Sequence, residues 1–271
     1  MAPGRRVVSP AGQYFAEVLR LTRGRAGLSQ SELGSRMSYT GAAVSAVETC
    51  AKPATDEFVD AAEKALDAGG VLRAARRYLR LERYPEHFQG FVQLEQEALS
   101  LTSFCSQVIH GLLQTEGYAR AVLASGFPPL DESDLEALTA ARMERAALLT
   151  RKPFCVINVV LDEAVLRRHV GTARTMTDQF DHLLACSELP NVVVQVMPVS
   201  RGVHAGLEGP FTVIETPECD RLVYMECNGN STLVARPEEV GVYARRCAMI
   251  GQQALRPEES FDLIKELAGG E

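Results

Sequence analysis

Residues 28–49 read LSQSELGSRMSYTGAAVSAVET, and the fold of the N-terminal part of the chain can be inferred from these residues. Ser29 followed three residues later by Glu32 is a capping box, in which each side chain satisfies the backbone amide of the other residue. A helix is therefore predicted to begin after Ser29, and Thr40 is suited to cap the next one. The apolar positions that these two helices are predicted to bury are Leu33, Met37, Val44 and Val47. Two short helices joined by a tight turn follow from this pattern.

Helical patterns continue on both sides of this stretch. A first helix is predicted to end between Gly24 and Gly27, Thr55 can cap a fourth helix, and a fifth runs from after Gly70 to about Glu82. The apolar face of the first helix is marked by Phe15, Val18, Leu19 and Thr22. Residues 11–82 are thus predicted to form an all-α helix-turn-helix domain, a DNA-binding unit that lays its third helix in the major groove of double-stranded DNA.

The predicted third helix offers few groups to a base edge. Gly41, Ala42 and Ala46 can touch a thymine methyl group but cannot form the paired hydrogen bonds that identify guanine or adenine. Specificity is therefore expected to depend on DNA shape, on the spacing of half-sites in a dimer, or on a partner. The residues predicted to contact DNA are Gln30, Arg36, Tyr39, Thr40, Gly41, Ala42, Ser45, Ala46 and Thr49.

Charge is distributed unevenly along the chain. The net charge is −7, but residues 1–80 carry +4 and residues 81–271 carry −11. A basic head on an acidic body is typical of proteins that contact nucleic acid at one end. Four arginines, Arg73, Arg76, Arg77 and Arg80, follow helical spacing. We favour the interpretation that they form a solvated basic face. The alternative is that they make a second phosphate contact or form a docking surface.

Beyond this domain the pattern changes. Residues 1–10 are predicted to be a flexible arm, residues 83–90 a linker, and residues 91–271 a larger mixed α/β domain, so that the chain is α+β overall. Strands are predicted at Phe154–Leu161, Val192–Met197, Phe211–Glu215 and Leu222–Glu226. Helices are predicted at Phe91–Ser100, Thr115–Ala124, Asp134–Thr150 and Thr177–Ser187, with two more opening at Pro237 and Pro257.

The larger domain shows no pattern typical of an enzyme, a cofactor site or a metal site. His204 and Glu208 lie in a glycine-rich stretch rather than on a helix, which favours a structural loop over a metal site. A ligand pocket beside residues 198–210 stays an alternative. The seven cysteines include no Cys-x-x-Cys pair, which suits a reducing compartment. With no signal peptide or membrane-spanning run, we expect a cytoplasmic, nucleoid-associated protein.

The motif Leu28–Leu33, followed by Val44–Glu48, resembles the Cro/repressor-like (XRE) family of helix-turn-helix regulators. The resemblance implies that Gln30 caps the second helix and meets a phosphate, that Gly41, Ala42, Ser45 and Ala46 face the bases, and that Glu48 makes a structural contact. Cys50 stands where the family usually has a glycine after the third helix, so the left-handed cap there is expected to be absent or strained.

The segment Ile109–Arg120 and several later motifs, among them Gln195–Pro198 and Ala254–Ser260, resemble the actinobacterial WhiJ-like regulators. His110 and Val199 depart from that family's usual Pro and Phe. The resemblance implies a transcription regulator often encoded beside a small acidic partner protein, in an antitoxin-like arrangement. We expect a homodimer whose C-terminal domain dimerises, binds this partner or senses a ligand. The alternatives are an interaction module with weak DNA readout, and an enzyme in the C-terminal domain.

Overall fold

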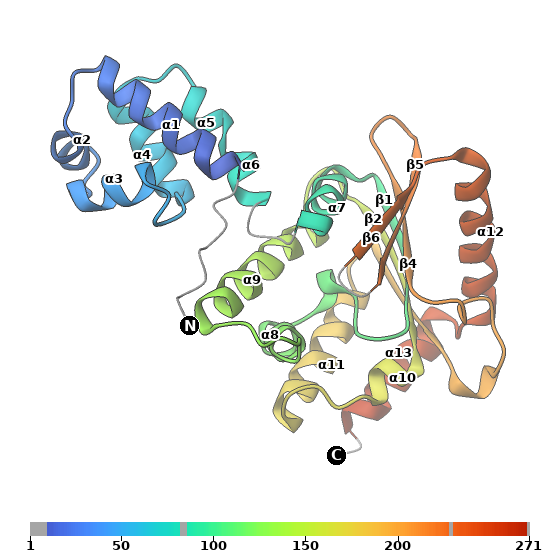
Figure 1. Ribbon diagram of the computed structural model, residues 1–271. Helices are drawn as coiled ribbons and strands as arrows, with labels where there is room; N and C mark the ends of the chain where they lie inside the picture. The colour runs from blue at the N-terminus through green and yellow to red at the C-terminus, as the bar shows by residue number, and fades with distance from the viewer. Residues whose placement is uncertain (1–9, 82–85, 228–229, 270–271) are drawn as a thin grey trace. The chain divides into compact units, whose positions relative to one another are not determined.

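The computed structural model describes residues 10–81, 86–227 and 230–269, which fall into two compact units that divide between Gln89 and Gly90 (Figure 1). Nearly all of the predicted arm lies outside the described residues, since the first helix begins at Pro10. Of the predicted linker, residues 83–85 also lie outside the described residues, and residues 86–90 form the start of helix α7, Glu86–Glu97.

The N-terminal unit is helical throughout its described residues. The predicted fifth helix is interrupted at Ala75 and becomes two helices. The helices are α1 (Pro10–Arg25), α2 (Gln30–Arg36), α3 (Gly41–Glu48), α4 (Asp56–Leu66), α5 (Val71–Ala74) and α6 (Arg76–Leu81).

The caps predicted from the sequence are confirmed. The Ser29 N–H donates to Glu32 Oε2 at 2.7 Å, and the Glu32 N–H donates to Ser29 Oγ at 3.2 Å. The hydroxyls of Thr40 and Thr55 accept the amides of Ala43 and Phe58 in the same way. Each cap satisfies an amide that would otherwise have no partner at a helix start.

One apolar core holds these helices together, and it contains every position predicted to be buried in α2 and α3. Its buried members are Phe15, Leu19, Leu33, Met37, Val44, Val47, Phe58, Val59, Ala62 and Leu72. The buried carboxylate of Glu63 closes the unit at the start of α5, where its two oxygens accept the backbone amides of Gly70, Leu72 and Arg73 at 2.6–3.0 Å.

The C-terminal unit is built on a mixed β-sheet. Within the described residues it has six strands in the order β3-β2-β1-β4-β5-β6. The strands are β1 (Ser100–Cys105), β2 (Val156–Asp162), β3 (Val192–Met197), β4 (Phe211–Glu215), β5 (Arg221–Cys227) and β6 (Asn230–Val234). β1, β2 and β3 are parallel, with Leu101 opposite Ile157, whereas β4, β5 and β6 continue the sheet in antiparallel fashion.

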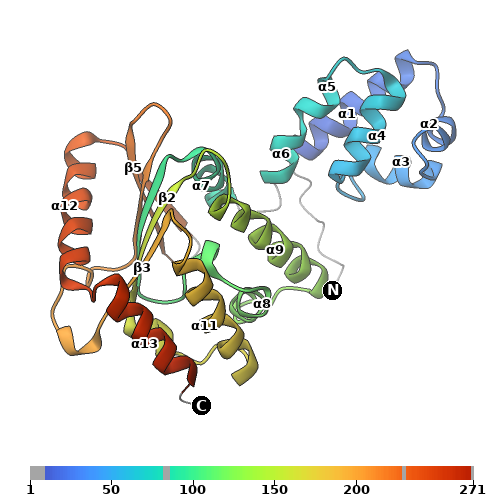
Figure 2. The ribbon, with the colours of Figure 1, turned by 180° about the vertical axis from the view of Figure 1, so that it is seen from behind.

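Helices cover both faces of this sheet. α12 packs against β1, β3, β4 and β5, while α11 packs on β3, and Figures 1 and 2 show α12 on one face and α8, α9 and α11 on the other. The helices after α7 are α8 (Glu116–Ala124), α9 (Glu132–Arg145), α10 (Glu163–Arg167), α11 (Ala173–Ser187), α12 (Pro237–Gln253) and α13 (Pro257–Gly269). Short 3-10 helices lie at Gly111–Leu113, Ala146–Leu149 and Val199–Arg201.

Chain segments far apart in the sequence close the unit. The outer edge of β3 is bonded to the segment before α13, where Leu255 N–H donates to the Val196 carbonyl, and to α13 itself, where Ser260 Oγ accepts the Val196 N–H. A buried ion pair joins α7 to α9, with Arg145 Nε and Nη2 at 2.6 and 2.8 Å from the carboxylate of Glu95. The predicted class, an all-α helix-turn-helix domain followed by a larger mixed α/β domain, is confirmed.

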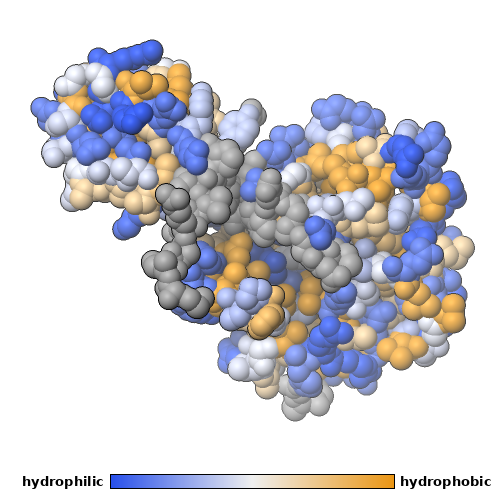
Figure 3. Space-filling model, in the orientation of Figure 1, coloured by the Kyte–Doolittle hydropathy of each residue, from blue (hydrophilic) through white to orange (hydrophobic). Residues whose placement is uncertain are grey.

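The surface of the C-terminal unit exposes several large apolar side chains. Figure 3 shows hydrophobic patches set among hydrophilic residues on the viewed face. The segment between β3 and β4 contributes Val199, Val203 and Leu207, of which Val203 is 84% exposed. None of the described helices combines the length and the apolar character needed to cross a bilayer.

Candidate DNA-binding surface

Two glycines allow α2 and α3 to approach each other closely. A Cβ on Gly34 would lie 2.8 Å from the carbonyl carbon of Thr40, and a Cβ on Gly41 would lie 2.7 Å from Ser31 Oγ. Real Cβ atoms do not approach other atoms so closely, so the two helices can meet only where both positions lack a side chain. The side of Gly41 that would carry a side chain therefore faces α2, although the family resemblance implies that Gly41 faces the bases.

Both helices end in the same way. The Tyr39 N–H donates to the Gly34 carbonyl and the Ser38 N–H to the Ser35 carbonyl, which is the Schellman pattern. After α3, the Ala51 and Cys50 N–H groups donate to the carbonyls of Ala46 and Val47 in the same arrangement.

The left-handed residue of this pattern is usually glycine, but here it is Ser38 (φ 60°) or Cys50 (φ 56°). The cap predicted at Cys50 to be absent or strained is therefore present, on a residue for which the left-handed conformation is unfavourable.

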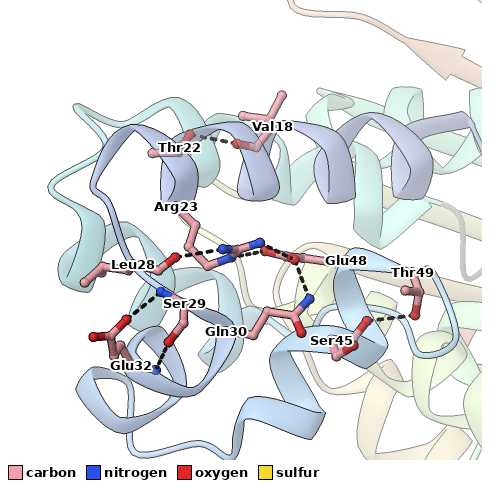
Figure 4. Close-up of polar contacts among 10 residues, drawn as sticks. All are labelled: Val18, Thr22, Arg23, Leu28, Ser29, Gln30, Glu32, Ser45, Glu48 and Thr49. Atoms are coloured by element: carbon pink, nitrogen blue, oxygen red, sulfur yellow. Dashed lines mark hydrogen bonds and ion pairs between the residues drawn. The ribbon is translucent and has the colours of Figure 1, made fainter.

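A buried carboxylate ties the three helices together (Figure 4). Glu48 of α3 has a side chain only 2% exposed, and it receives Nε and Nη2 of Arg23 at 2.6 and 2.9 Å. Gln30 Nε2 donates to the same carboxylate at 2.8 Å, and Arg23 Nη1 donates to the Leu28 carbonyl at 2.7 Å. Glu48 is thus a structural residue, as the family resemblance implies.

The charges around Glu48 keep it ionised. Burial acts to raise the pKa of this carboxyl, but the hydrogen bonds from Arg23 and Gln30, with the charges of Arg23 and Arg20, lower the pKa below the ordinary 4.5. The same contact raises the pKa of Arg23. The ion pair therefore persists across the physiological pH range.

One face of α3 points away from the apolar core. Ala42, Ser45, Ala46 and Thr49 recur at the i, i+3, i+4, i+7 spacing of a single helix face, opposite the buried Val44 and Val47. Ala42 and Thr49 are exposed, and Ser45 and Ala46 are half-buried. We call these four residues the outward face of α3. Small side chains on this face let the helix backbone approach a surface closely.

The other residues predicted to contact DNA have different surroundings. Gln30 is bonded to Glu48, and Tyr39 packs edge-on against Phe58 with ring centroids 5.2 Å apart. The Thr40 hydroxyl caps α3, and Arg36 at the end of α2 is exposed. The structure thus brings together four of the nine predicted residues on one helix face.

Two exposed basic residues outside the predicted DNA-contacting set lie near α3 in space or in sequence. Lys52 is exposed four residues beyond the end of α3, and Arg20 is exposed on α1 close enough for its charge to lower the pKa of Glu48. The position of Lys52, just after the predicted third helix, could have been used to predict a phosphate contact from the sequence. The place of Arg20 depends on how α1 crosses α3, which the sequence does not reveal.

The arginines of α5 and α6 contact the protein itself. Arg76 forms ion pairs with Asp56 and Asp60, and Arg73 lies 3.6 Å from Asp60. These pairs reduce the charge available to a phosphate. The side chains of Arg77 and Arg80 lie outside the described residues.

Polar groups of the C-terminal unit are held by structural contacts. His204 Nε2 lies 3.7 Å from Asp162 Oδ2, whereas Glu208 pairs with Arg246 at 2.7 Å, so His204 and Glu208 face different partners. Burial lowers the pKa of His110 to about 4, and its Nδ1 accepts the Leu112 N–H at 3.3 Å. Among the described residues, no three His, Cys, Asp or Glu side chains gather as a metal site would require.

Models of known protein families match both units. A family model described as a helix-turn-helix domain matches residues 15–75, from α1 to just beyond α5. A second, described as a domain of unknown function (DUF5753), matches residues 88–266, more than half of the chain. No curated protein and no solved structure matches the chain. The helix-turn-helix match supports DNA binding by the N-terminal unit.

Proposed function

Because the chain belongs to the DUF5753 family and carries a helix-turn-helix domain ahead of that region, we propose that it is a sequence-specific transcription regulator controlled through its C-terminal domain. The observation that carries this proposal is the outward face of α3, whose side chains are not part of the apolar core. The helix itself is held in place by the Arg23–Glu48–Gln30 network. A helix presented in this way is the element that enters the major groove. The exposed Arg36, Lys52 and Arg20 would contact the flanking phosphates.

The regulator acts as a homodimer in this proposal. A single helix of eight residues reads too few base pairs to find one site, and two copies one helical turn of DNA apart, about 34 Å, double the contact. Residues 81–271 carry a net charge of −11, and this negative charge would reduce non-specific binding to DNA.

Control passes through the C-terminal domain by binding rather than by catalysis. The exposed apolar side chains of Val199, Val203 and Leu207, which all come from the segment between β3 and β4, support a protein partner, because exposed apolar surface is a feature of interaction sites. The resemblance to WhiJ-like regulators supports a small acidic partner protein, and a ligand is the alternative. Action on DNA places the protein in the cytoplasm with the nucleoid.

The proposal is tested by recovering DNA and proteins together from cells that express the tagged full chain. A small set of sharp genomic sites sharing a palindrome is expected, and purified protein should bind such a site more weakly as salt rises. Broad, sequence-independent recovery of DNA, or binding that ignores ionic strength, would contradict it. The Arg36→Ala variant should weaken binding to all duplexes equally, since phosphate contacts carry no sequence information.

A second candidate function is an antitoxin-like interaction module with weak DNA readout of its own. It is favoured by the short side chains on the outward face of α3. In that case the same experiment would return one small protein in stoichiometric amount and no sharp DNA sites.

A further inference from the structure

We propose that the outward face of α3 reads the 5-methyl groups of thymine, so that the operator is recognised by methyl contacts in the major groove rather than by hydrogen bonds to base edges. This inference rests on the proposed DNA-binding function and names the chemical feature that the same surface recognises. It follows from which groups the structure leaves available there.

The outward face lacks the groups that pair with purines. Identification of guanine takes a guanidinium or ammonium group, and identification of adenine takes an amide. Ala42, Ser45, Ala46 and Thr49 supply none of these, and Gly41 turns toward Ser31. A cytosine amino group would need a carboxylate, which this face also lacks.

The long polar side chains of Gln30 and Glu48 are engaged within the protein. The amide nitrogen of Gln30 donates to Glu48, and the carboxylate of Glu48 is buried against Arg23. Turning Glu48 toward a base would break its ion pair with Arg23 and leave a buried charge without its partner, which is costly. Turning Gln30 away would remove one hydrogen bond from the same carboxylate. The network therefore fixes α3 and engages the Gln30 amide nitrogen and the Glu48 carboxylate within the protein.

The two hydroxyls on this face discriminate little. The Thr49 hydroxyl already donates to the Ser45 carbonyl at 2.7 Å. The Ser45 hydroxyl can donate or accept, so it can pair with several base edges. What remains is methyl surface: the Cβ atoms of Ala42 and Ala46 and the Cγ2 of Thr49. The apolar feature of the major groove is the thymine 5-methyl group.

The test distinguishes recognition of methyl groups from recognition through hydrogen bonds. Duplexes with a random central segment are amplified with either dTTP or dUTP, and each pool is selected on the full-length protein. Uracil keeps every hydrogen-bonding group of thymine and lacks only the methyl. A motif rich in thymine is expected from the first pool, and remaking the selected site with uracil should weaken binding about fourfold for each contacted methyl, the value for burying one methyl group.

A rescue experiment identifies the methyl itself. Cytosine placed at a contacted thymine should weaken binding, and 5-methylcytosine at that position should restore most of the affinity. Equal affinity of the thymine and uracil sites, within twofold, would overturn the inference even if binding is tight and specific. Loss of binding to every duplex from both pools would instead overturn the proposed function, and this inference with it.

A pair of variants links the effect to α3. Ala46→Gly removes a methyl group from the outward face, so the thymine-to-uracil effect at the base it contacts should fall below twofold. Ala43→Gly makes the same change on the same helix but off that face, and it should leave the full thymine-to-uracil effect. An equal effect in both variants would show that helix stability, not methyl contact, is being measured.

Discussion

Arg23 of α1 and Glu48 of α3 form a bidentate ion pair, with two nitrogen–oxygen distances of 2.6 and 2.9 Å and a carboxylate that is 2% exposed. Gln30 of α2 joins the same carboxylate, so one side chain links the three helices that make the helix-turn-helix. Planar guanidinium–carboxylate contacts of this kind fix orientation as well as adding stability. The position of α3 relative to α1 and α2 thus depends on charge as well as on apolar packing.

The Glu48→Gln variant is expected to destabilise the N-terminal unit by roughly 1.5–3 kcal/mol near neutral pH, because charged hydrogen bonds are lost from a buried site. The pKa of Glu48 is lowered by folding, so its stabilising contribution is complete above the ordinary value of 4.5 and is lost as pH falls through the lower folded value. Chemical denaturation of both proteins from neutral to acid pH tests this. A stability difference independent of pH would contradict it.

The Cys50→Gly variant is expected to stabilise the N-terminal unit by about 1 kcal/mol, because glycine adopts the left-handed conformation without steric cost. Cys50→Ala serves as the control, since it removes the sulfur and keeps the strain. Thermal unfolding of the three proteins should rank glycine above cysteine and alanine. Equal gains from glycine and alanine would show that the thiol, not the backbone, is unfavourable.

The Gly34→Ala variant should destabilise the N-terminal unit by roughly 1–3 kcal/mol, the usual cost of forcing an extra group into a packed site. Its Cβ would lie within 3 Å of three backbone atoms of the turn and α3. Gly24→Ala on α1 is the matched control, because no atom lies within 4 Å of its Cβ, and it should be neutral or stabilising. A stabilising effect of Gly34→Ala would refute the close contact between α2 and α3.

In the C-terminal unit, Arg145→Met should cost roughly 3–5 kcal/mol, because it leaves the Glu95 carboxylate buried without its partner. The double variant Glu95→Leu/Arg145→Met should recover much of this loss. Arg174→Ala breaks an exposed pair with Asp178 and should change stability by less than about 1 kcal/mol. Additive losses in the double variant would mean that the two side chains act separately.

The sequence predicts most of the N-terminal unit because its signals are local. Ser29, Thr40 and Thr55 each cap a helix that begins at the next residue, and the apolar spacing identifies the buried face. The interruption at Ala75 carries no such signal. The direction of Gly41 could not be predicted, because it depends on the distance between α2 and α3.

The C-terminal unit shows where local signals fail. β1 contains Ser100, Thr102 and Ser103 and lacks a continuous apolar run, yet it lies at the centre of the sheet between β2 and β4. The sequence predicts the end of a helix there instead, and it does not predict β6, which is short, polar and at the edge. Strand order follows from pairing between distant segments, which periodicity along the chain does not report.

The most direct test of the central claim is the affinity of the full-length protein for a duplex carrying a site recovered from cells, compared with that of Ala42→Glu. This change puts a carboxylate on the outward face of α3 in the first turn of the helix, where the helix dipole favours a negative charge, so folding should be retained. Val71→Glu, in the first turn of α5, is the control of equal charge. At least tenfold weaker binding by Ala42→Glu, from like-charge repulsion in the groove, with less than twofold change for Val71→Glu, is the predicted result. Unchanged affinity of Ala42→Glu would contradict the account, because α3 would then not face the DNA.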